Sequence, residues 1–111
     1  MDKAILNWVK SSDYDIKTAE ALYRSGRYVY VIFMCHLAVE KALKAIAAFN
    51  VNKMPPKTHD LLYLVKLVSL DVPKSCVTIL IHLNEVSVPT RYPEDIEKLS
   101  RAYNKMAAGR Y

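Results

Sequence analysis

The chain has 111 residues, of which 52% are hydrophobic, and its formal net charge is +5. That length supports one hydrophobic core but not two, so we expect a single domain over residues 1–111. Only two glycines interrupt this apolar sequence, which favours packed helices over a turn-rich sheet protein or a disordered tail. The positive charge suits a phosphate-bearing partner or an acidic protein surface. An ordinary basic surface that only keeps the protein soluble would have the same net charge.

The sequence has no pattern typical of secretion or of a membrane span. The N-terminus, MDKAILNWVK, lacks the sustained apolar core of a signal peptide. The most apolar run, residues 28–39, is closed by Glu40 and Lys41, well short of the roughly 20 residues that cross a bilayer. Cys35 and Cys76 lie in apolar stretches, where intracellular proteins keep free buried thiols. We therefore expect a cytoplasmic protein without a membrane segment.

Two long helices are predicted in the first half of the chain. Residues 2–25 show apolar and small side chains at helical spacing, and residues 27–49 are apolar nearly all round before becoming alanine-rich. The second helix should therefore be central and the most buried. The predicted inward face of the first helix comprises Ile5, Trp8, Val9, Ser12, Ile16, Ala19, Leu22 and Tyr23.

A third helix is predicted after a proline-rich break. Pro55 and Pro56 require the chain to leave helical conformation. Thr58 then occupies the position expected of an N-cap. Apolar residues recur at helical spacing after it, so we expect a helix over about residues 59–69.

Proline also divides the last part of the chain. Pro73 predicts that a new helix begins there, because proline is favoured in a first helical turn. A loop is predicted over residues 86–93, and Pro93 should open the last helix. Five helical segments and no alternating apolar pattern predict an all-α fold, an antiparallel up-and-down bundle of four to five helices.

The residues that could bind or react lie in three short motifs. They are HLAVEKALKA at residues 36–45, KTHDL at residues 57–61 and TRYPE at residues 90–94. The sequence contains neither a glycine-rich phosphate loop nor an HExxH pair, and its cysteines and histidines are too scattered for a structural zinc site. We therefore predict no metal and no cofactor, and anion binding only through side chains and helix N-termini.

In this order and spacing, the three motifs resemble the HEPN domain family. The likeness is greatest to its prokaryotic members encoded beside minimal nucleotidyltransferases, and it extends from the first helix, which contains Trp8, to Arg91-Tyr92-Pro93. The resemblance implies a helical bundle that forms homodimers and binds nucleotides or RNA. It also implies a place in a toxin–antitoxin pair.

The chain departs from the family members that cleave RNA. Those members carry an arginine, four to six further residues and then a histidine. After Arg91, the positions where that histidine would fall are occupied by Ile96, Glu97 and Lys98. Metal-independent cleavage needs a group that moves the 2′-OH proton near neutral pH, and arginine cannot release its own. We therefore expect a binding module without ribonuclease activity. His59 could replace the missing histidine only if the fold brings it to Arg91.

Four residues are predicted to form one anion-binding cleft: Lys41, Lys44, His59 and Arg91. Lys41 and Lys44 share a helix face, where both ammonium groups could meet one phosphate. Arg91 offers a planar donor fork held between prolines.

Each of these residues also has a structural interpretation. Lys44 could pair with Glu40 on a solvated face, His59 could hold a loop, and Arg91 could clamp Glu40 or Glu94. His36 and His82 lie in apolar stripes and are expected to be core or interface histidines.

Three functional hypotheses follow. The first is a homodimeric binding module for nucleotide or RNA that docks a nucleotidyltransferase, and the second is an endoribonuclease using Arg91 with His59. The third is a structural adaptor that binds an acidic protein. The homodimer is predicted because the second helix is apolar on more faces than a small bundle covers. Its predicted contacts are Tyr28, Tyr30, Val31 and Met34.

Overall fold

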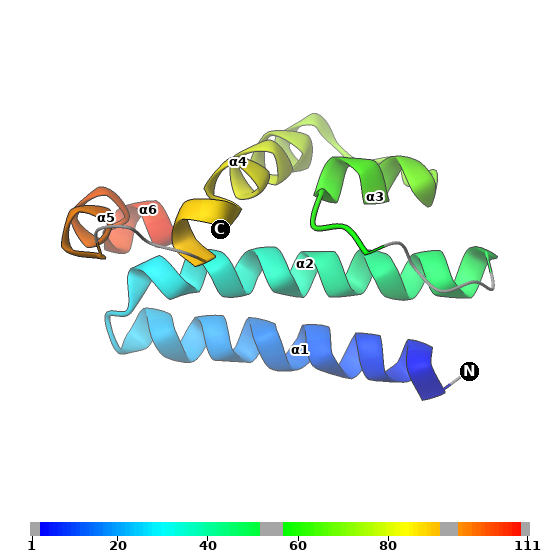
Figure 1. Ribbon diagram of the computed structural model, residues 1–111, viewed down its shortest axis with the longest axis horizontal. Coiled ribbons are helices and arrows are strands. Elements are labelled where there is room, and N and C mark those ends of the chain that lie inside the picture. Colours follow the sequence, from blue (N-terminus) through cyan, green and yellow to red (C-terminus); the bar gives the residue numbers. More distant parts are fainter. Residues whose placement is uncertain (1–2, 52–56, 92–95, 110–111) are drawn as a thin grey trace.

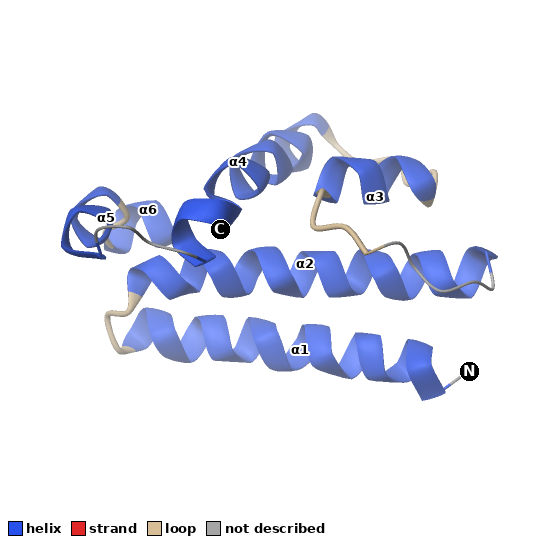
Figure 2. Cartoon of the chain, viewed as in Figure 1, coloured by secondary structure: helices blue, strands red, loops and turns tan. Residues whose placement is uncertain are grey.

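The computed structural model describes residues 3–51, 57–91 and 96–109, and every regular element within these ranges is a helix (Figures 1 and 2). The elements are α1 (Lys3–Arg24), α2 (Tyr28–Val51), α3 (Leu61–Leu67), α4 (Lys74–Arg91), α5 (Ile96–Ala102) and α6 (Lys105–Ala108). The all-α prediction is confirmed.

Helices α1 and α2 form an antiparallel pair along the longest axis of the molecule (Figure 1). The turn between them contains Gly26, whose φ of 81° is a left-handed conformation that glycine adopts without a steric penalty. The amide of Arg27 donates to the carbonyl of Leu22 at 2.9 Å and closes the end of α1. This turn places the two longest helices side by side.

Helix α2 is the centre of the fold. It packs against α1 on one side and against α3 and α4 on the other, while α5 and α6 lie near its N-terminal end (Figure 1). The largest fully buried side chains come from α2, α3 and α4: Ile32, His36, Leu61, Leu64 and Leu83. The prediction that the second helix is the most buried element is confirmed.

The inward face of α1 is narrower than the sequence predicts. Ile5 and Ala19 are buried, but Val9 is 45% exposed and Ile16 is 37% exposed. The broad prediction for these last two residues is wrong because the extensive packing of α1, within the described residues, is against α2, while α6 meets α1 at Tyr23 near its C-terminal end. A helix with one neighbour covers only a narrow stripe of its surface.

Helix α3 begins later than predicted, and its N-cap is Asp60, not Thr58. The Asp60 carboxylate accepts hydrogen bonds from the amides of Leu62 and Tyr63 at 3.1 and 3.3 Å. Thr58 instead accepts the amide of Asp60 through its hydroxyl at 3.1 Å. Aspartate is a stronger cap than threonine, and its charge also suits the positive end of the helix.

The loop predicted over residues 86–93 is wrong as far as Arg91, because α4 continues through that residue. Pro89 therefore lies within the helix. Proline fixes φ close to the helical value and removes one backbone donor. Near the last turn of a helix, this loss affects few of the following hydrogen bonds.

The single last helix predicted from Pro93 is two shorter ones. Residues 92–95 lie outside the described part of the chain, and α5 and α6 are separated at Tyr103 and Asn104. On α4, Cys76 and His82 are exposed, so the expectation of a buried thiol at Cys76 is wrong. For His82 the core position is wrong, and the alternative of an interface position stays a prediction.

Candidate functional site

A buried carboxylate lies at the centre of the candidate site. Glu40 is on α2 and is 4% exposed, and each of its two oxygens has a partner. Oε1 is 2.6 Å from Nδ1 of His59, and Oε2 accepts a hydrogen bond from Nζ of Lys44 at 3.2 Å. Burying a carboxylate is costly unless it is paired and hydrogen-bonded, and these two contacts meet that requirement.

His59 is held at its backbone as well as at its side chain. His36 lies one turn before Glu40 and is fully buried, and its Nε2 is 2.9 Å from the carbonyl oxygen of His59. A carbonyl only accepts, so Nε2 of His36 is the donor. Two neighbouring turns of α2 therefore fix one residue of the α2–α3 connection, and the expectation of a core histidine is confirmed for His36.

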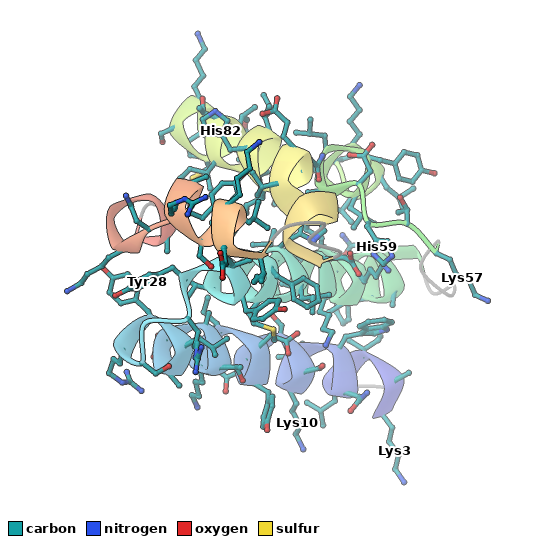
Figure 3. The ribbon with its side chains drawn as sticks, turned by 60° about the vertical axis from the view of Figure 1, so that its left-hand side comes forward. Lys3, Lys10, Tyr28, Lys57, His59 and His82 are labelled. Carbon is teal, nitrogen blue, oxygen red and sulfur yellow. The ribbon has the colours of Figure 1, made fainter. Side chains whose placement is uncertain are left out.

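The His59 side chain remains largely open to solvent despite these contacts. Its exposed fraction is 60%, compared with 5% for the Glu40 side chain. Figure 3 shows His59 lying over α2, while Lys57 extends away from the molecule. The arrangement is an exposed imidazole with a buried carboxylate behind it, and such a ring can exchange hydrogen bonds or protons with a ligand.

The start of α3 fixes the chain immediately after His59. Asn84 on α4 donates from Nδ2 to the Asp60 carboxylate at 2.9 Å, and its side-chain oxygen accepts the amide of Leu61 at 3.0 Å. Together with the capping bonds of Asp60, these contacts join α3 to α4. The position of His59 is thus supported from α2 on one side and from α3 and α4 on the other.

Lys41 faces away from this cluster and toward α1. Its ammonium group is 2.7 Å from Oδ2 of Asp15 and donates to the hydroxyl of Ser11 at 2.7 Å. Beside it, the Ser12 hydroxyl donates to the carbonyl of Ala38 at 2.6 Å. These bonds join α1 to α2 and leave Lys41 with an anionic partner of its own.

Lys44 is buried as well as paired. It is 7% exposed, and its ammonium group lies 5.6 Å from the centre of the Trp8 ring, within the range of a cation–π contact. The Glu40 pair foreseen as an alternative does form, but it is buried, and the expected solvated face is wrong.

The structure thus brings two of the four predicted site residues together. Lys44 and His59 meet at Glu40, whereas Lys41 pairs with Asp15. The Arg91 side chain lies outside the described residues, although the backbone of Arg91 ends α4.

The sequence interpretation named Glu40 only as an alternative partner and did not identify Asp15, although these two carboxylates hold the two lysines. Glu40 follows a long apolar run, and Asp15 lies next to the apolar position Ile16. An acidic residue inside an apolar stripe was the available signal for each, because such a residue is rarely buried without a cation.

The residues predicted for a homodimer contact differ in exposure. Val31 is 4% exposed and belongs to the core of this chain, whereas Tyr30 is 42% exposed. Met34 packs against the core. Tyr28 makes an edge-to-face contact with Tyr23, with ring centres 5.8 Å apart. Of the four, Tyr30 offers the most surface to a second copy.

Within residues 3–51, 57–91 and 96–109, there is no group of three potential metal ligands drawn from histidine, cysteine, aspartate and glutamate. In the same described residues, each helix is too short or too polar to cross a membrane.

Comparison with known families gives a match that covers nearly the whole chain. The model of the HEPN domain matches residues 5–109. Comparison with curated proteins and with solved structures gave no match. The matched range includes α1 to α6 apart from the first two residues of α1, so it contains all the contacts of the candidate site.

Proposed function

The chain belongs to the HEPN domain family, and from this premise we propose that it is a cytoplasmic nucleotide- or RNA-binding module that works as a homodimer. We place it in the branch whose members partner a minimal nucleotidyltransferase in a toxin–antitoxin-like pair. The net charge of +5 suits a polyanionic ligand.

The observation that carries the proposal is the way His59 is held. Its side chain is 60% exposed, yet two buried residues of α2, Glu40 and His36, bind its side chain and its backbone. Fixing an exposed side chain costs conformational entropy. A ligand that meets a ring already in place does not bear that cost again.

Arg91 is retained from its sequence motif as the proposed phosphate contact, because a guanidinium group matches the geometry of a phosphate. Lys41 and Lys44 are assigned structural roles, because each already has a carboxylate partner. The proposal therefore assigns phosphate recognition to Arg91 and assigns His59 to a neighbouring group of the same ligand.

Thermal unfolding with ATP and with a short single-stranded RNA tests this function. Ligand at about 100 times its dissociation constant stabilises a folded protein by about 2.7 kcal/mol, so the melting temperature should rise by several degrees, less at high salt. His59→Ala should reduce the rise to about half, the effect of a tenfold weaker affinity, whereas His82→Ala should retain it. His82 is a matched control because it is also exposed and lies on α4, away from His59 (Figure 3). Absence of a rise with both probes would contradict the proposal.

A second function, metal-independent cleavage of RNA, is favoured by one observation. The contact between His59 and Glu40 gives the ring a carboxylate partner, an arrangement that suits proton transfer. Incubation of labelled RNA with the protein in a chelator tests it. Cleavage products that form with the wild type and disappear with His59→Ala would establish ribonuclease activity. If the RNA stays intact, the second function is contradicted and the binding function remains.

A further inference from the structure

The contact between Glu40 and His59 is not required to neutralise the buried carboxylate. Lys44 already supplies a positive charge to Glu40 at 3.2 Å, and the Lys44 side chain is only 9% exposed. Nor is the contact required to hold the α2–α3 connection, because His36 binds the backbone carbonyl of His59. The remaining consequence of the 2.6 Å contact is to orient the imidazole ring of His59.

The contact also determines which nitrogen of that ring carries a proton. A carboxylate only accepts hydrogen bonds, so Nδ1 of His59 must be the donor to Glu40. In the neutral ring, Nε2 is then unprotonated and acts as an acceptor. A carboxylate that fixes the tautomer of a histidine in this way strongly influences what the other nitrogen can bind.

We propose that Glu40 is a positioning residue that holds His59 in the tautomer protonated on Nδ1 and presents Nε2 to a hydrogen-bond donor of the ligand. In a nucleotide or an RNA, a ribose hydroxyl is such a donor. This inference rests on the proposed function for its ligand. Its claim about the ring concerns the chain alone.

Lys44 makes the substitution Glu40→Gln unusually informative. The Lys44 ammonium group has only donors, so the oxygen of the new amide should turn toward it, and the amide nitrogen should turn toward His59. An amide nitrogen donates, so Nδ1 of His59 must then accept, and the proton moves to Nε2. The variant should therefore reverse the tautomer while leaving the shape of the site nearly unchanged.

Nuclear magnetic resonance of the imidazole nitrogens measures this tautomer directly, with no ligand present. The neutral wild-type ring should carry its proton on Nδ1, and Glu40→Gln should carry it on Nε2. Asp15→Asn is the matched control, because Asp15 is the other buried carboxylate paired with a lysine of α2 and does not contact His59. In Asp15→Asn, the His59 ring should keep the wild-type tautomer even if the stability of the variant falls.

Binding supplies the second readout. With the tautomer reversed, the protonated Nε2 of His59 faces a hydrogen-bond donor of the ligand. Glu40→Gln should therefore bind ATP and a short single-stranded RNA about tenfold more weakly than Asp15→Asn, the loss expected for one hydrogen bond. If Glu40→Gln does not fold, Glu40→Asp keeps the charge beside Lys44 and shortens the reach toward His59. It should give a mixture of tautomers.

The outcomes separate this inference from the function on which it rests. A wild-type ring protonated on Nε2, a tautomer that Glu40→Gln leaves unchanged, or unchanged or tighter binding by that variant would overturn the positioning role. If the tautomers behave as expected but the wild type binds neither probe, the proposed function fails. The control of His59 by Glu40 then stands as a property of the fold.

Discussion

Lys41 is held inside the α1–α2 interface by Asp15 and Ser11. Removing one partner of a buried ion pair leaves the other charge without compensation, which costs about 3–5 kcal/mol. Lys41→Met should therefore lower the free energy of unfolding by about 3 kcal/mol, the lower end because the Lys41 side chain is 23% exposed. Urea denaturation measures the change.

The same variant tests the assignment of Lys41. Because its ammonium group is bound to Asp15, affinity of the folded variant for ATP should remain at the wild-type level. A large loss of affinity with little loss of stability would return Lys41 to the binding site.

The two cysteines should differ sharply in reactivity. Burial raises the pKa of the Cys35 thiol to about 11, so at pH 8 only about one Cys35 in a thousand is the reactive thiolate. Cys76 is exposed, although both residues line one apolar cavity of about 310 Å³. Iodoacetamide should label Cys76 alone in the native protein and both residues in urea, as mass spectrometry can show. Equal native rates would mean that this cavity opens frequently.

Arg91 is the remaining residue of the proposed phosphate contact. Its replacement by alanine should weaken nucleotide binding by about 1.5–3 kcal/mol, the scale of a charged hydrogen bond, and should leave the melting temperature unchanged. Calorimetric titration with ATP, beside a melting curve of each protein, checks both statements. If the melting temperature falls while affinity is retained, Arg91 is a structural clamp.

At the scale of elements, Asp60 and Asn84 couple the start of α3 to α4. Loss of the N-cap in Asp60→Ala should lower the free energy of unfolding by about 1 kcal/mol. Asn84→Ala should also lower it, because Asn84 loses its hydrogen bonds to Asp60 and Leu61. Because the two residues share a hydrogen bond, their effects should not be additive. A double-mutant cycle by urea denaturation measures the coupling, and additive effects would contradict it.

Thr58→Ala is the control for that cycle. Thr58 accepts one exposed amide and does not cap α3, so the substitution should cost less than Asp60→Ala. The reverse order would restore Thr58 as the cap.

The helices were predictable from the sequence where the periodic pattern was strong, and their ends were not. Pro73 was identified correctly as the start of α4, since its carbonyl accepts the amides of Cys76 and Val77. Pro89 has the same local signature but lies inside that helix. Proline restricts its own φ to a helical value in both places, and that value suits the start and the interior of a helix alike, so the residue by itself does not decide whether the helix continues.

For the whole molecule, the homodimer stays a prediction, and Tyr30 is its most exposed proposed contact. Sedimentation at tens of micromolar should give about twice the 12.7 kDa monomer mass, since a dissociation constant of about 1 μM would suffice. Tyr30→Glu should give the monomer, because a charge in an apolar contact must be desolvated. Tyr63→Glu should remain dimeric, because Tyr63 is similarly exposed but lies on α3. A monomeric wild type would exclude the dimer at these concentrations.

The site was only half predictable from sequence for a related reason. The motifs identified Lys44 and His59, which the fold does bring together at Glu40. They could not show that Lys41, three residues before Lys44, faces α1. Residues three apart share a broad helix face, and both lysines do lie near α1, Lys41 at Asp15 and Lys44 over Trp8. They differ in the carboxylate that each one pairs with, since Lys44 pairs with Glu40.

The central position of α2 has a consequence for how this protein can change over generations. Its side chains bind α1 through Lys41, the α2–α3 connection through His36 and Glu40, and Trp8 through Lys44. A substitution in this stretch disturbs more than one interface at once and needs a compensating change elsewhere. The exposed face of α1 is not constrained in this way. Substitutions should therefore accumulate on that face over evolution, while the middle of α2 should change little.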